Sequence, residues 1–248
     1  AILDEILRVK SFNIHNCYIE RNKMNLVPFV SDKCHWFKDG GNTYNTRKEE
    51  SMKKIIFATT NENKVREVRM MMDGLDVELC TMKEAGVDVD IVEDGTTFEE
   101  NAIIKAKTIM EITGEIAIAD DSGLEVDYLD GAPGIYSERF LGEDTSYDIK
   151  NNYIIEKLKD AKGKERSARF VCAMAVAFPN GEISTCKGII EGLITYEQKG
   201  TNGFGYDPIV YVPEFEMTTG EMTPELKNSI SHRGKALEQM KEILKGKL

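Results

Sequence analysis

Hydrophobic and polar positions follow two different periods along the chain from residue 52 onward. Short apolar runs rich in β-branched residues predict strands at 54–58, 77–80, 116–119, 124–129, 168–178, 182–190 and 209–212. Apolar residues spaced three and four apart, preceded by capping residues, predict helices at 65–72, 97–112 and 145–158, and two more that begin after Thr223 and Ser231. Strands alternate with helices early and longer strands come later, which predicts an α/β fold around a mixed sheet.

The first 51 residues have a different texture. They are rich in Asn, contain the single Trp, and end in a polar, charged stretch at 42–51 that resembles a linker. Their formal charge is +1, whereas residues 52–248 carry −12. We therefore expect a domain boundary near residue 51, with 1–51 as an extension of unknown role and 52–248 as the functional domain.

The extension also holds two Cys and two His, the side chains that bind zinc in many proteins. They are His15, Cys17, Cys34 and His35. Their spacing matches no familiar zinc motif, and adjacent Cys34 and His35 are poorly placed to bind one tetrahedral ion together. Ordinary structural or surface side chains are the favoured interpretation.

Composition narrows the class of function. The net charge of −11 disfavours wholesale binding of nucleic acid or of an anionic membrane surface, since both need an excess of Lys and Arg. The longest apolar run, 170–178, is too short to span a bilayer, and no signal peptide is visible. Five irregularly spaced cysteines favour reduced thiols and a cytoplasmic location. A single phosphorylated small molecule remains a possible ligand if a few cations gather in one cleft.

One candidate for phosphate binding lies where the strand at 54–58 turns into the first helix. The segment consists of Thr59, Thr60, Asn61, Glu62, Asn63 and Lys64. A helix N-terminus presents free N–H groups and the positive end of a dipole, and Lys64 adds a cation. Helix capping by Thr60 or Asn61 is the ordinary alternative and explains every residue except Lys64.

A second candidate is the acidic pair Asp120-Asp121, followed by Ser122-Gly123, which we expect at the end of an apolar strand. Successive strand residues point to opposite faces, so one carboxylate can enter a cleft while the other braces it. Carboxylates at such a place suit Mg²⁺, and Glu93 could supply a second ligand. A simple Asx turn is the alternative.

Two later segments complete the candidates. Gly203-Phe204-Gly205-Tyr206-Asp207-Pro208 offers close backbone approach, aromatic faces for a base and an acceptor in Asp207. Ser231 as helix cap places His232 and Arg233 in a first helical turn, where cations are normally unfavourable, which indicates a purpose such as binding an anionic or carbonyl-bearing ligand. A glycine-rich turn and a structural histidine are the alternatives. Together, the four segments favour a magnesium–nucleotide site.

Six motifs occur in an order that resembles the inosine/xanthosine triphosphate pyrophosphatase family. They are Thr59-Thr60-Asn61-x-x-Lys64, Phe98-x-Glu100-Asn101-Ala102-x-x-Lys105-Ala106, Ala119-Asp120-Asp121-Ser122-Gly123-Leu124, Gly131-Ala132-Pro133-Gly134-Ile135-Tyr136-Ser137, Gly203-Phe204-Gly205-Tyr206-Asp207-Pro208 and Ser231-His232-Arg233. The resemblance covers residues 52 to about 246. Glu138 and Asn202 depart from the pattern, and we expect neither to touch the chemistry.

This resemblance implies hydrolysis of ITP, dITP and XTP to the monophosphate and pyrophosphate with Mg²⁺, in an elongated two-lobed homodimeric α/β protein with the cleft between its lobes. It makes Asp121 the proton acceptor and, with Glu93, a metal ligand. It assigns the phosphates to residues 59–64, Lys105, Ser122 and Lys227. It assigns base recognition to Phe204, Gly205, Tyr206, Asp207, His232 and Arg233. Two alternatives stay open: a related diphosphatase acting on other modified or pyrimidine triphosphates, and a non-catalytic nucleotide sensor.

Overall fold

The computed structural model describes residues 37–39, 42–44, 52–72 and 76–248. The chain divides into two units, Ala1–Glu50 and Ser51–Leu248. In the first, β1 (Phe37–Asp39) pairs antiparallel with β2 (Asn42–Tyr44). The four residues that suggested a zinc site lie outside the described residues.

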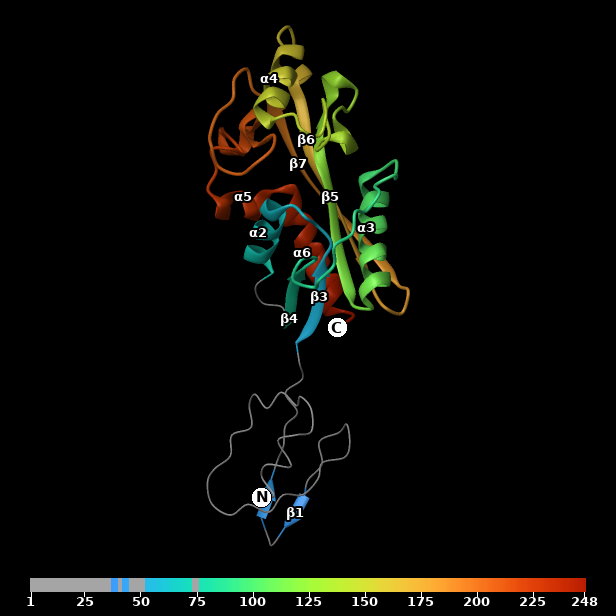
Figure 1. Ribbon diagram of the computed structural model, residues 1–248. Helices are drawn as coiled ribbons and strands as arrows, with labels where there is room; N and C mark the ends of the chain where they lie inside the picture. The colour runs from blue at the N-terminus through green and yellow to red at the C-terminus, as the bar shows by residue number, and fades with distance from the viewer. Residues whose placement is uncertain (1–36, 40–41, 45–51, 73–75) are drawn as a thin grey trace, which may run out of the picture. The chain divides into compact units, whose positions relative to one another are not determined.

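The second unit is built on a mixed sheet of seven strands in the order β4-β3-β5-β6-β7-β8-β9 (Figure 1). Its strands are β3 (Lys53–Phe57), β4 (Val77–Thr81), β5 (Ile116–Val126), β6 (Ser167–Ala177), β7 (Ile183–Ile194), β8 (Val210–Val212) and β9 (Met217–Thr218). β3 runs parallel to β4 and β5, and every later pairing is antiparallel. The α/β class and the mixed sheet expected from the sequence are confirmed.

Five α-helices in the described residues surround this sheet: α2 (Glu62–Met71), α3 (Phe98–Thr113), α4 (Tyr147–Lys157), α5 (Pro224–Ile230) and α6 (His232–Lys245). Their caps follow from the sequence. The side chains of Asn61, Thr97 and Ser231 accept hydrogen bonds from first-turn N–H groups, and Gly114 ends α3 with a φ of 69°. Short 3₁₀ turns lie at Asp127–Leu129, Gly134–Tyr136, Gly163–Arg166, Asp207–Ile209 and Pro213–Phe215.

Alternation along the strands assigns each side chain to one face of the sheet. In β3, Ile55 and Phe57 join a core with α2 and α6, whereas Ile56 joins the core beneath α3. In β5, Ile118 belongs to the first core and Ala119 to the second. Figure 1 accordingly shows α3 on one face of the sheet, and α2 and α6 on the other.

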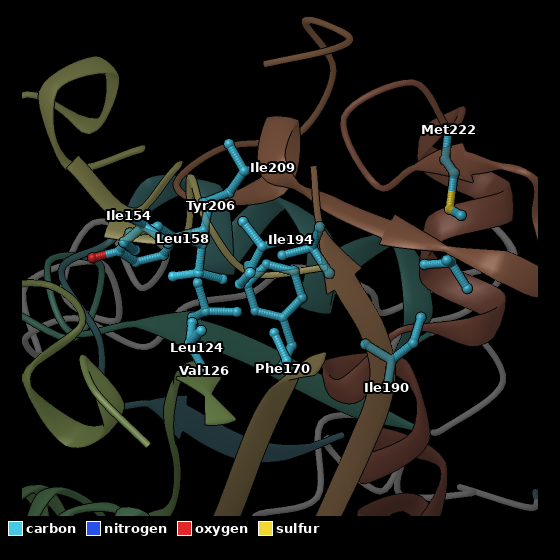
Figure 2. Close-up of a cluster of buried hydrophobic side chains, with 14 residues drawn as sticks. Leu124, Val126, Ile154, Leu158, Phe170, Ile190, Ile194, Tyr206, Ile209 and Met222 are labelled. Atoms are coloured by element: carbon cyan, nitrogen blue, oxygen red, sulfur yellow. The ribbon is translucent and has the colours of Figure 1, made fainter. Parts of the chain in front are cut away.

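A third apolar cluster occupies the other end of the long central strands. It combines Leu124 and Val126 of β5 with Phe170 of β6, and Ile154 and Leu158 of α4 (Figure 2). Asp120 and Asp121 therefore lie on the stretch of β5 between this cluster and the two cores formed with α2, α3 and α6.

The structure corrects one expected boundary. We expected a strand to end at Ala119 and a second to begin at Leu124, with a turn between them. Instead, β5 continues without a break to Val126 and pairs with β6 along this whole stretch, Asp120 opposite Met174 and Asp121 opposite Ala173. Polar residues persist in this buried strand because charged partners approach from both faces.

Candidate active site

The two adjacent aspartates of β5, Asp120 and Asp121, face opposite sides of the sheet. Asp120 has the parity of Ile118 and faces α2 and α6, where it contacts Lys64 and Arg233. Asp121 has the parity of Ala119 and faces α3, where Asn101 and Lys105 contact it. The alternation expected from the sequence is confirmed, and it gives two neighbouring carboxylates separate environments.

Asp120 is fully buried and surrounded by donors. The Arg233 guanidinium donates to its Oδ2 from Nη2 at 2.9 Å and Nε at 3.2 Å, and the Lys64 ammonium lies 3.4 Å from Oδ1. Burial by itself would raise the pKa of Asp120, but the charges of Lys64 and Arg233 outweigh it and hold the pKa well below its ordinary value. Asp120 is therefore an anion that anchors cations rather than a group free to accept a proton.

A chain of alternating charges extends from this anchor. Glu67 of α2 accepts from Arg233 Nη1 at 2.5 Å and from Lys227 Nζ at 2.8 Å. Lys227 also donates to Asp207 Oδ2 at 2.6 Å. Burial would raise the pKa of Glu67, yet Arg233 and Lys227 hold it below its usual value. These contacts explain the cation in the first turn of α6, since Arg233 faces the carboxylates of Asp120 and Glu67.

On the opposite face, Asp121 is also buried, but 10% of its side chain is exposed, against none for Asp120. Asn101 Nδ2 donates to its Oδ2 at 3.1 Å and Lys105 Nζ donates to Oδ1 at 3.3 Å. The same ammonium lies 3.1 Å from Oε1 of Glu93, whose side chain is 29% exposed. Two carboxylates from distant segments thus converge on one cation, with solvent reaching one of them.

This pair also bears on metal binding. Within the described residues, no cluster of three or more His, Cys, Asp or Glu side chains is arranged to hold an ion. Mg²⁺ is commonly held by one or two carboxylates, with phosphate oxygens and water completing its shell. Glu93 and Asp121 fit that donor set, since they already share the ammonium of Lys105.

Beside the anchored cations lies a narrow pocket of about 50 Å³ with aromatic walls. The ring of Phe204 lies 4.9 Å from the Lys227 ammonium and 5.8 Å from the Arg233 guanidinium. His232 is buried and stacks on Phe170 with ring centroids 4.9 Å apart. Burial, reinforced by Arg233 and Lys227, lowers the pKa of His232 well below 6.5, so the imidazole is neutral near pH 7.

A family model described as the Ham1 family matches residues 55–243, which include all these side chains. The chain belongs to the Ham1 family. It is 46% identical over 201 residues to a dITP/XTP pyrophosphatase of Clostridium perfringens, covering 79% of this chain and 98% of that protein. It is 48% identical over 191 residues to a dITP/XTP pyrophosphatase of Desulforamulus reducens, covering 77% and 95%.

Solved structures of Ham1 proteins resemble the second unit. A HAM1 protein from Coxiella burnetii shares 41% identity and a TM-score of 0.72, covering 79% of this chain and 100% of that one. A nucleoside-triphosphatase / dITP/XTP pyrophosphatase from Mycobacterium abscessus shares 36% identity and a TM-score of 0.61, covering 75% and 98%. The family resemblance drawn from the six motifs is confirmed.

The Ham1-family motifs bring most of the expected site residues together. Those that line the narrow pocket are Asn61, Lys64, Ser122, Phe204, Gly205, Tyr206, Asp207, Lys227, His232 and Arg233. Lys105 and Glu93 join them through Asp121, which is adjacent to Ser122. Three others, Thr59, Thr60 and Glu62, line a separate hollow of about 1190 Å³ next to β4. Asn63 lines neither hollow; its N–H donates to the Asn61 cap.

Two expectations need revision in detail. Tyr206 belongs to the apolar cluster of Figure 2 and its hydroxyl donates to the Ser137 carbonyl at 2.7 Å, so Phe204 is the freer aromatic face. Glu138, expected to stand apart from the chemistry, lines the pocket. It follows Ser137 in a turn that folds back over β5, a placement that the sequence pattern did not indicate.

Sequence reasoning also missed several residues of the site. Glu67 lies one helical turn after Lys64, and that spacing was the available signal for a shared face. Asn101 lies within one of the six family motifs, but the resemblance did not assign it a role. Phe170 and Tyr147 carried no local signal, because only the packing of β6 and α4 brings them to the pocket.

Proposed function

We propose that this protein hydrolyses ITP, dITP and XTP to the corresponding monophosphate and pyrophosphate, and so removes non-canonical purine nucleotides. The observation that carries the proposal is that the two adjacent carboxylates of β5 have different surroundings. One carboxylate anchors the cations of the pocket, and the other lies beside a lysine and a second carboxylate on the opposite face. Relatives that match nearly their whole length carry the name dITP/XTP pyrophosphatase.

Asp121 acts as the proton acceptor for the attacking water. Its neighbours Asn101 and Lys105 hold the carboxylate in place while leaving capacity for a further hydrogen bond. Glu93 and Asp121 would hold Mg²⁺, which when bound supplies charge neutralisation to the phosphate oxygens. Lys64 and Lys105 bind the triphosphate from the two faces of the strand, and the start of α2 adds the positive end of its helix dipole.

Selectivity for the base arises at the other end of the pocket. Phe204 offers a face for the purine, and Lys227, His232 and Arg233 surround it with donors. Inosine and xanthosine present an oxygen acceptor at position 6, whereas adenine presents an amino donor. Placing the amino donor of adenine, in place of an oxygen acceptor, against these donors forgoes a hydrogen bond and costs about 1–3 kcal/mol, which disfavours adenine by roughly 5- to 150-fold.

We further propose that residues 52–248 hold the whole activity and that the protein acts as a cytoplasmic homodimer. Every residue assigned above lies between Asn61 and Arg233. None of the helices in the described part of the chain has the length and apolarity needed to cross a membrane. Light scattering coupled to size exclusion would report twice the mass of one chain for a dimer.

A substrate panel tests the proposed activity. Initial rates with ITP, XTP, dGTP, ATP, dUTP and dTTP in the presence of Mg²⁺ should give kcat/KM at least about fivefold higher for ITP and XTP than for ATP. Equal rates on ATP would contradict the assignment of base selectivity. Faster turnover of dUTP or dTTP would indicate the related diphosphatase. Tight ITP binding without any turnover would indicate a nucleotide sensor.

A further inference from the structure

The ring of Phe204 sits on a short, tightly bent loop. Gly203 and Gly205 on either side have φ values of 73° and 67°, a conformation that favours glycine. The N–H of Phe204 donates to Asp207 Oδ2 at 2.7 Å, which fixes the loop on one side. The position of the ring in the pocket therefore depends on whatever fixes the other side.

A buried amide of α4 supplies that second attachment. Asn151, 1% exposed, donates from Nδ2 to the carbonyl oxygen of Gly205 at 3.2 Å and to Oε1 of Gln198 at 3.1 Å. Its Oδ1 has no hydrogen-bond partner among the described residues. Tyr147, one turn earlier on α4, packs against Gly205 and lines the pocket, but Asn151 does not line it. Asn151 thus acts on the loop without facing a ligand.

The direction of this hydrogen bond is set by a charge on the surface. A carboxylate only accepts, so Asp148 Oδ1 requires the Nε2 of Gln198, which donates to it at 2.8 Å and to Asn152 Oδ1 at 3.1 Å. Gln198 must then direct its Oε1 toward Asn151, and Asn151 must donate to that oxygen from Nδ2. The other N–H of the Asn151 amide then donates to the carbonyl oxygen of Gly205. In the opposite amide orientation, Asn151 Oδ1 would instead face Gln198 Oε1.

We propose that Asn151 is a positioning residue for base recognition: through Gly205 it holds Phe204 against the nucleotide base. This inference rests on the proposed function. Phe204 and Gly205 are consecutive residues of the loop. Loss of the Asn151 donor to Gly205 therefore frees the Phe204 ring to move away from its position in the pocket. Other elements bind the phosphates and hold Asp121 in position, so the geometry at both is unchanged.

Asn151→Ala and Asn151→Asp test this inference. Both remove the donor to Gly205, and the Asp variant keeps the shape of the side chain in case the Ala variant does not fold. We expect KM for ITP to rise about tenfold while kcat changes by less than about twofold, since only binding shared by substrate and transition state is lost. Steady-state kinetics give both values, and thermal melting reports whether each variant is folded.

Glu156→Ala and Glu156→Gln are the controls, because Glu156 is an exposed residue of the same helix outside this relay. They should keep the wild-type KM. An unchanged KM in both Asn151 variants, a loss confined to kcat, or an equal rise in KM in the Glu156 variants would each overturn the inference while wild-type turnover of ITP upholds the proposed function. A wild-type protein without ITP turnover would overturn both.

Discussion

At the scale of single residues, identical side chains acquire different roles from the partners that the fold supplies. Asp120 is surrounded by Lys64 and Arg233, whereas Asp121 faces Lys105 and the solvent-accessible Glu93. The sequence was sufficient to predict that the two aspartates diverge, because side chains alternate along a strand. It was not sufficient to predict which carboxylate would be paired with both Lys64 and Arg233, since those cations come from helices more than a hundred residues apart.

The neutral state of His232 has a consequence for stability. Its pKa in the folded protein lies below 6.5, because of burial and the nearby Arg233 and Lys227. Between the lowered pKa of the folded protein and about 6.5, His232 carries a proton in the unfolded chain but not in the folded one. Stability is therefore lost as the pH falls below about 6.5. We expect the free energy of unfolding to fall by up to about 2 kcal/mol between pH 7 and pH 5 through this residue.

Urea unfolding of the wild type and of His232→Asn at pH 7, 6 and 5 measures that contribution. The other two histidines are common to both proteins, so their effects cancel in the comparison. The variant should lose less stability than the wild type over this range. Parallel pH profiles would show that His232 does not carry the effect.

At the scale of elements, the long strands place the site by contact with helices on both faces. Helix positions, their caps at Asn61, Thr97 and Ser231, and the hairpin of β6 and β7 could all be predicted from period and capping chemistry. The uninterrupted course of β5 could not, because Asp-Asp-Ser-Gly has the composition of a turn. Its strand conformation depends on pairing with β6 and on ion pairs from other elements.

The approach of β7 to α6 gives a prediction at this scale. A Cβ at Gly188 of β7 would collide with the carbonyl oxygen of His232 and lie 2.6 Å from the nitrogen of Ala236. We expect Gly188→Ala to lower the free energy of unfolding by at least about 2 kcal/mol, since backbone rather than a flexible side chain must move. Because α6 begins at His232, the same change should also weaken turnover.

Gly246→Ala provides the control, as its Cβ would meet only ordinary contacts at 3.6 Å or more and its φ is −76°. Urea unfolding should place this variant within about 0.5 kcal/mol of the wild type. Equal effects of the two substitutions would contradict the close packing of β7 against α6.

At the scale of the whole molecule, an acidic chain with a net charge of −11 assembles a local group of cations. Lys64, Lys227 and Arg233 on one face of β5 are matched in the ligand-free protein by Asp120, Glu67 and Asp207. Composition could exclude a broad nucleic-acid surface, and six ordered motifs could indicate the family. The alternating network itself was not predictable, because the partners of Glu67 lie on α5 and α6 and reach it only when these helices pack against α2.

The products formed from ITP test the central claim most directly. We expect the wild type with Mg²⁺ to yield inosine monophosphate and pyrophosphate in equal amounts, resolved by chromatography and ³¹P NMR. Asp121→Asn should form neither while keeping the wild-type melting temperature, and Asp144→Asn, an exposed control, should form both. Release of orthophosphate and inosine diphosphate by the wild type, or undiminished turnover by Asp121→Asn, would contradict the account.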